Sequence, residues 1–271
     1  MNLIVVEMRR ALHRRVVRVL IVLALLACTA AGIIVFADSA GKTLAELQVG
    51  DELHPALMRN WWIAGTGDGA LMISIFFLLL GGLFGGASVT GAEWRAGTVT
   101  TVLTWEPRRV RFHLSRTAAC AILAALISFA LQAVFLASLL PAVIANGSGA
   151  GTDAGWWVSL IVAMLRASLL TAIAAMLGVA LATLGRNTSF ALVVIFTWFA
   201  VIEGLVRGLK PGLAQYLWGA NIATVVPWAQ LPDARFQRGP LLALLTVTFY
   251  VLAITTVATL VFRRRDIAST S

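Results

Sequence analysis

Six runs of apolar residues, each long enough to cross a membrane as a helix, constrain this 271-residue chain more than any other feature. A helix rises about 1.5 Å per residue and the hydrocarbon core of a bilayer is about 30 Å thick, so a span needs about 20 residues. The runs cover about residues 16–37, 70–92, 118–144, 156–184, 188–206 and 240–262. We therefore predict an all-α integral membrane protein with six transmembrane helices, in a single transmembrane domain over residues 1–271.

The composition excludes a soluble globule. Charged residues make up only 12% of the chain and apolar residues 60%, whereas a soluble domain carries about 25% charged residues. The formal net charge of +9 would suit a nucleic-acid-binding protein, but in so apolar a chain clustered arginines mark the cytoplasmic face and its anionic lipids. We therefore expect membrane lipid, and no nucleic acid, as a partner.

The basic residues also predict the orientation. An even number of spans puts both termini on one side, and that side carries Arg9, Arg10, Arg14, Arg15, Arg18, Arg95, Arg108, Arg109, Arg111, Arg116, Arg186, Arg263, Arg264 and Arg265. The other side carries Lys42, Arg59, Arg207, Lys210, Arg235 and Arg238. The excess of arginine predicts that both termini lie in the cytoplasm. Frequent Ala, Val and Arg indicate a bacterial genome, and hence the bacterial cytoplasmic (inner) membrane.

Residues 1–18 have the pattern of an amphipathic helix. At 100° per residue one arc is apolar, and the other carries Arg9, Arg10, Arg14 and Arg18. This pattern is typical of a helix in the headgroup plane; the alternative is a basic flank that only orients the first span. The sequence "LLAC" at 25–28 resembles a lipoprotein signal, but the apolar run continues past it to Phe36, too far for such a signal.

No motif for catalysis or for a metal or nucleotide site is found. The "GKT" at residues 41–43 lacks the first glycine of a phosphate-binding loop, because Phe36 stands at that position. The two cysteines, Cys28 and Cys120, lie inside apolar runs and suggest neither a disulfide framework nor a metal site. We therefore predict that the chain itself is not an enzyme and binds no cofactor.

The connection at residues 93–116 is the most informative part of the chain. Thr98 follows Gly97 and is expected to cap a short helix. Leu103 shares an apolar face with Val99 and Val102, and Pro107 ends the helix. Such a helix suits a groove on another protein, and the alternative is a turn whose apolar face rests on the membrane.

Here the sequence resembles a family, the type 2 permeases of ABC transporters. The residues that carry the resemblance are Glu93, Gly97–Thr98, Leu103, Pro107 and the basic run that contains Arg109 and Arg111, together with the C-terminal "FRRRDI" at 262–267. The resemblance implies the transmembrane subunit of a type V ABC transporter, usually an exporter. In such a transporter separate cytoplasmic ABC ATPase subunits hold ATP and Mg²⁺.

The same resemblance implies that the chain pairs with a second permease, an identical copy or a paralogue. The loop at 93–116 would dock on the ATPase as a coupling helix, with Glu93 bonded to a donor there. The alternative function is a stand-alone secondary transporter or an integral membrane enzyme, which would need an inverted repeat or a midplane carboxylate site. The transported substrate is not indicated.

The connection at residues 208–239 is too apolar for a solvated loop and is broken by Pro211, Gly219, Pro227 and Pro232. Broken apolar segments at membrane depth must be buried in protein or lie at the interface. We therefore expect an outer re-entrant segment, as the family resemblance implies, or else an interfacial loop.

Three polar side chains fall within the predicted spans: Gln132, Arg166 and Glu203. A charge at mid-membrane usually faces the bundle interior or a partner. We expect Arg166 and Glu203 to form an ion pair; the alternative is that Arg166 lines the substrate path. Gly81, Gly82, Gly85 and Gly86 have the small-xxx-small spacing that permits close helix approach, within the chain or between subunits.

Overall fold

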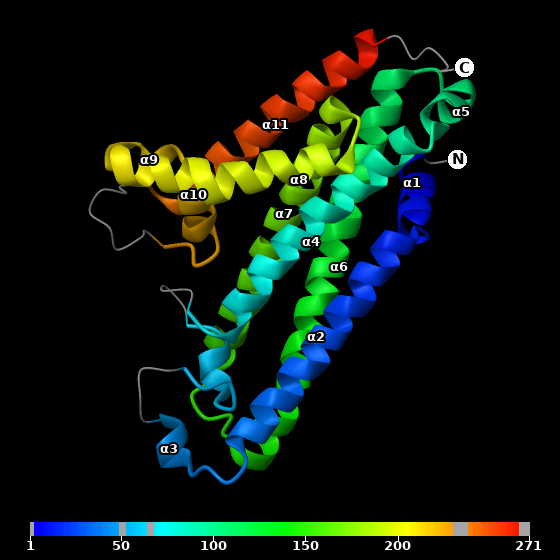
Figure 1. Cartoon of the computed structure of the whole chain (residues 1–271). Coiled ribbons are helices and arrows are strands. Elements are labelled where there is room, and N and C mark those ends of the chain that lie inside the picture. The colour runs from blue at the N-terminus through cyan, green and yellow to red at the C-terminus, as the bar shows by residue number, and fades with distance from the viewer. Residues whose placement is uncertain (1–2, 49–52, 64–67, 230–237, 266–271) are drawn as a thin grey trace.

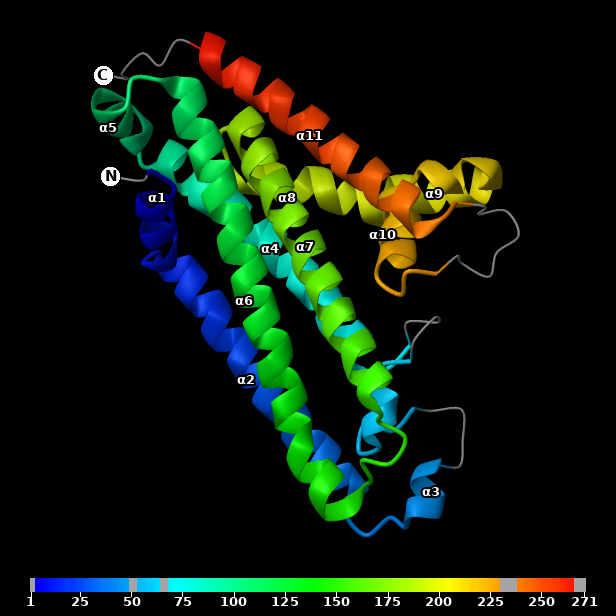
Figure 2. The same cartoon turned by 180° about the vertical axis from the view of Figure 1, so that it is seen from behind.

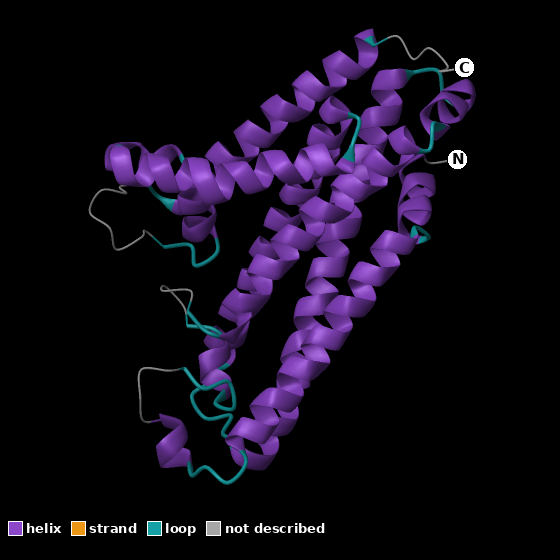
Figure 3. Ribbon diagram, viewed as in Figure 1, coloured by secondary structure: helices purple, strands orange, loops and turns teal. Residues whose placement is uncertain are grey.

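The computed structural model describes residues 3–48, 53–63, 68–229 and 238–265, which form helices and loops (Figure 1). Six helices are long and apolar enough to cross a membrane: α2 (Arg15–Ser39), α4 (Ala70–Arg95), α6 (Arg109–Asn146), α7 (Ala154–Gly185), the composite Thr188–Leu209 and α11 (Pro240–Arg264). Among the described residues no strand is present (Figure 3). The predicted all-α protein with six candidate spans is confirmed.

Shorter elements complete the fold. Helix α1 covers Leu3–Leu12, α3 Leu44–Gln48, η1 Met58–Trp61 and α5 Thr98–Trp105. The composite fifth span consists of α8 (Thr188–Phe196), the π-helical turn η2 (Thr197–Ile202) and α9 (Glu203–Leu209). A 3-10 helix, η3 (Pro211–Tyr216), and α10 (Trp218–Val225) follow it.

The helices at the basic end are longer than the apolar runs predict. Helix α4 continues to Arg95, and α6 begins at Arg109 rather than near residue 118. Arginine is a good helix former, and the Phe112 amide already donates to the Arg108 carbonyl. The connection therefore shrinks to residues 96–108. The N-terminal helix is instead shorter than the predicted residues 1–18 and ends at Leu12, because Arg14 has an extended backbone conformation.

Helix α7 is the centre of the bundle and packs against α4, α6 and α11, while α2 lies along α6. In both views the long helices α2, α4, α6 and α7 run side by side, and α8–α9 and α11 diverge from them (Figures 1 and 2). Helix α1, α5 and the end of α11 lie at one end of the bundle, and α3 lies at the other (Figure 1). The arginine-rich segments are thus gathered at one end.

The opposite end is closed by tryptophans. Trp61 and Trp62 are each 2% exposed and belong to the main apolar core. The Trp61 indole donates to the Pro55 carbonyl at 2.8 Å, and the Trp156 indole donates to the Trp62 carbonyl at 3.0 Å. Because its N–H group is bonded inside the protein, the Trp61 ring can be buried.

The segment at 208–239 is described except for residues 230–237. Its two short helices do not reach across a membrane, since α10 has eight residues. The buried Val225 and Val226 join the same apolar core as Leu71 and Ala163. This part of the chain is therefore packed into the protein and is not a solvated loop.

The glycines of α4 divide into two pairs with different surroundings. A β-carbon at Gly82 would lie 2.7 Å from the Thr171 carbonyl oxygen, and one at Gly86 would overlap the Ala175 carbonyl. Gly178 of α7 approaches the Leu83 carbonyl of α4 in the same way. A β-carbon at Gly81 or Gly85 would meet no neighbour within 4 Å. The spacing thus serves close packing of α4 on α7 through Gly82 and Gly86 only.

Replacement of Gly86 by valine should therefore destabilise the protein, because the added side chain meets backbone that cannot move without separating α4 from α7. We expect a loss of about 1–3 kcal/mol of unfolding free energy, read as a lower midpoint of thermal unfolding in detergent. Gly81→Val is the matched control and should unfold near the wild-type temperature. Equal losses in the two variants would contradict the packing described here.

Candidate functional site

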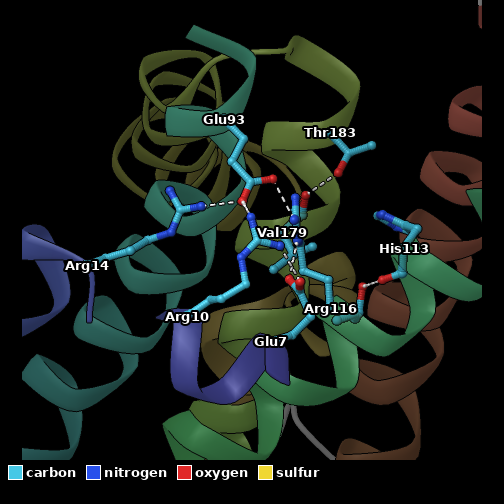
Figure 4. A network of polar contacts seen from close by, with 9 residues as sticks. Glu7, Arg10, Arg14, Glu93, His113, Arg116, Val179 and Thr183 are labelled. Carbon is cyan, nitrogen blue, oxygen red and sulfur yellow. Dashed lines mark hydrogen bonds and ion pairs between the residues drawn. The ribbon is translucent and has the colours of Figure 1, made fainter. Parts of the chain in front are cut away.

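Five charged side chains meet at the arginine-rich end, where α1, α4 and α6 come together (Figure 4). Glu7 and Arg10 come from α1, Arg14 from the break between α1 and α2, Glu93 from the last turn of α4, and Arg116 from α6. We call this set the ion network. It joins segments that are more than 100 residues apart in the sequence.

Each carboxylate of the ion network is held by more than one arginine. Glu7 accepts from Arg10 Nη1 at 2.6 Å and from Arg116 Nε at 3.0 Å. Glu93 Oε1 accepts from Arg14 and, at 3.2 Å, from Arg10 Nη2. Glu93 Oε2 lies 2.5 Å from Arg116 Nη2 at an angle outside hydrogen-bond geometry, so this contact is an ion pair.

The ion network is largely removed from solvent. The side chains of Glu7, Glu93 and Arg116 are each 4% exposed, whereas Arg14 and Arg10 remain 22% and 38% exposed. Burial lowers the pKa of the Arg14 guanidinium, and the charge of Glu93 partly offsets this shift. Arginine stays protonated even so. Three guanidiniums face two carboxylates, which leaves the set with one excess positive charge.

Aromatic packing supports the buried arginine. The Arg116 guanidinium lies 4.3 Å from the centre of the Phe112 ring, one turn earlier in α6. Phe112 is itself packed against Phe262 of α11. The ring therefore fixes the side chain from one side while the carboxylates hold it from the other.

The short helix α5 begins at Thr98, five residues after Glu93. Gly97 adopts a left-handed conformation with φ +67°, which glycine tolerates without strain, and precedes the helix as its cap. The prediction that Thr98 caps α5 is wrong, because Thr98 is already inside the helix and no side chain caps it. The helix ends at Trp105, two residues before Pro107, as predicted.

The apolar face of α5 is covered by the chain itself. Val99 is buried with Phe112 and Phe262, and Val102, Leu103 and Trp94 pack against this cluster. The sequence predicts that this face contacts either a groove on a partner or the membrane; in the structure it contacts α6 and α11 instead. The outward face of α5 instead carries the exposed threonines Thr98, Thr101 and Thr104.

Basic side chains tie the end of α11 to the same region. Arg109 donates to the Arg265 carbonyl, and Arg265 donates to the carbonyls of Thr183 and Leu184 at 2.8 and 2.7 Å. The end of α7 is thereby joined to the ends of α6 and α11. Arg111 is more exposed, and its Nη1 lies 3.8 Å from Glu106 Oε2.

The predicted ion pair between Arg166 and Glu203 is absent. Glu203 accepts from the Gly219 amide at 2.9 Å and from Arg207 at 3.3 Å, so it holds the start of α10. The Arg166 guanidinium lies 4.7 Å from the centre of the Trp228 ring. The pair does not form because α8–α9 diverges from α7 (Figure 1) and the 208–239 segment supplies a contact for each charge.

Gln132 has a structural position. It is fully buried, and its amide nitrogen lies 3.2 Å from the hydroxyls of Ser128 and Ser168. Ser128 in turn lies 3.2 Å from the Thr171 hydroxyl. These bonds join α6 to α7 inside the bundle, as polar side chains do between membrane helices. No cluster of three or more His, Cys, Asp or Glu that could hold a metal is found in the described part of the chain.

Glu93 was predictable from the sequence, but the residues that bind it were not. Arg10, Arg14 and Arg116 were counted only as charges for the orientation and, for Arg10 and Arg14, as the polar arc of the N-terminal helix, and Glu7 was overlooked. One signal was available: Glu7 is the only acid in the first 37 residues, among five arginines. An acid that interrupts a basic helix indicates a partner for those arginines.

Arg116→Leu should destabilise the protein strongly, because it leaves Glu7 and Glu93 buried with fewer counter-charges. Removing one member of a buried ion pair typically costs about 3–5 kcal/mol, and thermal unfolding in detergent would measure it. Arg111→Leu, the same change in the same helix, is the control and should cost about 1 kcal/mol or less because its pair is largely exposed. Similar losses in both variants would refute the importance of the ion network.

Neither a scan against models of known protein families nor a search of curated proteins gives a match for this chain.

Proposed function

We propose that this chain is the membrane-spanning permease subunit of an ATP-driven ABC exporter of the type V arrangement. Separate cytoplasmic subunits would bind ATP with Mg²⁺, and two permeases, identical or paralogous, would form the substrate pathway. The resemblance of Glu93, Gly97, Thr98, Leu103 and Pro107 to the type 2 permease motif supports this proposal. The observation that carries it is that α5, between two spans, is fixed to the bundle and presents an exposed threonine face.

A coupling element must transmit a push from an ATPase to the spans, and a loose loop would yield instead. Helix α5 is attached on two sides. The ion network holds Glu93 at the end of α4, and the apolar cluster of Val99, Phe112 and Phe262 fixes α5 to α6 and α11. A force on α5 would therefore move α4, α6 and α11 together as a rigid body.

In this proposal Glu93 does not contact the ATPase and instead holds the end of α4 in place. Its carboxylate is occupied by arginines of its own chain, so the contact with the ATPase falls to other residues. The threonine face of α5 and the neighbouring exposed Arg95 and Arg108 are the accessible groups. We propose that a polar rather than an apolar groove of the ATPase receives α5.

The orientation follows from the same end of the molecule. The fourteen arginines that gather near α1, α5 and the end of α11 would face the cytoplasm of a bacterial cell under the positive-inside rule. The segment with η3 and α10 would then re-enter the membrane from the outer side. The burial of Val225 and Val226 supports this, because broken backbone at membrane depth needs to be enclosed by protein.

The test is copurification of a tagged permease with the P-loop ATPase encoded by the neighbouring gene. We expect the wild-type chain to retain the ATPase and Thr101→Arg to lower the retained amount about tenfold, equivalent to about 1.4 kcal/mol. The added arginine would clash at the docking face without touching the buried side of α5. ATP hydrolysis by the complex in vesicles should fall in parallel.

Ala150→Arg is the matched control, since it adds the same side chain at an exposed position between α6 and α7 at the opposite end. It should leave copurification unchanged. If no P-loop ATPase binds the wild-type chain, the permease proposal fails. If the ATPase binds equally well to Thr101→Arg, α5 is not the docking element.

A further inference from the structure

A cavity of about 780 Å³ lies where α8 and η2 diverge from α4 and α7, with α10 along one wall (Figure 1). Its lining consists of apolar residues, among them Leu79 of α4, Leu170 of α7, Phe199 of η2 and Ile222 of α10. Ligand sites in proteins have volumes of about 300–1,000 Å³. The cavity is therefore large enough for one molecule of drug size.

Arg166 lies on the face of α7 that lines this cavity. The lining residues of α7 are Leu170, Ile173, Ala174 and Leu177. The period of an α-helix places Arg166 one turn before Leu170 on the same face. The wall formed by α10 ends at Val226, and the ring that the Arg166 guanidinium contacts belongs to Trp228, two residues later. Arg166 and Trp228 therefore stand at one end of the cavity.

The charge of Arg166 has no counter-charge in the described part of the chain. No ion pair among those residues includes Arg166, and Glu203, the expected partner, is bonded to Gly219 and Arg207. Arg166 lies twelve residues beyond the start of α7 at Ala154, or about 18 Å along the helix. A charge inside a span usually marks a partner or a ligand pathway. The N–H donors of this guanidinium are thus available to a ligand.

Trp228 has a backbone conformation that is unfavourable for a bulky residue. Its φ of 56° is in the left-handed region, where such residues are rare. Strain of this kind clusters at ligand clamps and active sites. In this conformation the centre of the ring lies 4.7 Å from the Arg166 guanidinium. The ring thereby holds the cation at the end of the cavity without neutralising it.

We propose that the cavity binds one organic anion with an apolar body, whose anionic head group is received by Arg166. A guanidinium can donate two parallel hydrogen bonds to such a group, and the apolar walls take the rest of the molecule. A neutral or cationic amphiphile would leave the arginine without a counter-charge. As a substrate site of the exporter the cavity rests on the proposed function, whereas binding itself requires only this chain.

The experiment labels the cavity with a photoreactive fatty acid. The full chain, without ATPase, is placed in phosphatidylcholine nanodiscs and irradiated with palmitate that carries a diazirine, or with the neutral amide of the same molecule. Crosslinked peptides are then identified by mass spectrometry. We expect the anion to label the cavity residues of α4, α7 and α10 at least about fivefold more than the amide.

Arg166→Gln should abolish this preference for the anion, and Arg166→Lys, which keeps the charge, should retain most of it. Ala200→Phe adds a large side chain at an exposed lining position of η2 and should lower labelling by both probes. It also tests the site if thermal unfolding shows that Arg166→Gln does not fold. Arg238→Gln is the matched control, because this arginine also lies over an aromatic ring, that of Tyr216, but does not line the cavity.

A preference for the anion that the folded Arg166→Gln variant keeps would overturn the proposal. Loss of labelling when phosphatidylglycerol replaces part of the phosphatidylcholine would do the same, since the occupant would then be a lipid. Asp233, the acid nearest to Trp228 in the sequence, lies outside the described residues. If Arg166→Gln destabilises the protein and Asp233→Asn reverses this loss, the chain itself neutralises the arginine and the proposal fails. Absence of a bound ATPase would change none of these results.

Discussion

Two carboxylates buried among three arginines determine how the basic end of this protein is built. An unpaired buried charge is strongly unfavourable, so Glu7 and Glu93 are stable only where guanidiniums from other elements reach them. Arg116 donates a hydrogen bond to Glu7, forms an ion pair with Glu93 and is itself 4% exposed. Helices α1, α4 and α6 must therefore meet at one place, although they are distant in the sequence.

The position of α5 depends on this arrangement. The ion network fixes the end of α4 at Glu93, and only two residues, Ala96 and Gly97, separate α4 from α5. The apolar face of α5 then packs on Phe112 and Phe262. Arg109 donates to the Arg265 carbonyl, and Arg265 donates to the Thr183 carbonyl, so the end of α7 is joined to the same region. The basic end is thus one connected body. Along α4, a β-carbon at Gly82 or Gly86 would meet α7, whereas one at Gly81 or Gly85 would meet no atom within 4 Å. Close packing and open space therefore alternate along this helix.

The fold was predictable from the sequence to the level of its six spans, because about 20 consecutive apolar residues leave few alternatives to a membrane helix. The ends of the spans were less predictable. Hydropathy does not distinguish a basic helical turn from a basic loop, so α6 begins about nine residues before its apolar run. The wrong cap at Thr98 has a similar origin, since the left-handed Gly97 takes the cap position and shifts Thr98 into the helix.

The candidate site was predictable only in part, because side-chain partners depend on how helices meet. Glu93 was identified by its motif, but its partners Arg10, Arg14 and Arg116 lie on other helices and no local spacing relates them. The Arg166–Glu203 pairing was inferred because both charges fall within predicted spans, and a position within a span gives no information about the lateral distance to another helix. Glu203 instead bonds the Gly219 amide, in a segment that hydropathy could only describe as irregular.

The most direct test of this account is hydrogen exchange of the backbone amides of α1. If the ion network holds α1 on α4 and α6, the amides at residues 7–12 should be protected in the wild-type protein in nanodiscs. In Arg116→Leu they should exchange at least about tenfold faster, while the amides of α7 stay protected. Rapid exchange of α1 in the wild-type protein, or protection that Arg116→Leu leaves unchanged, would contradict the account.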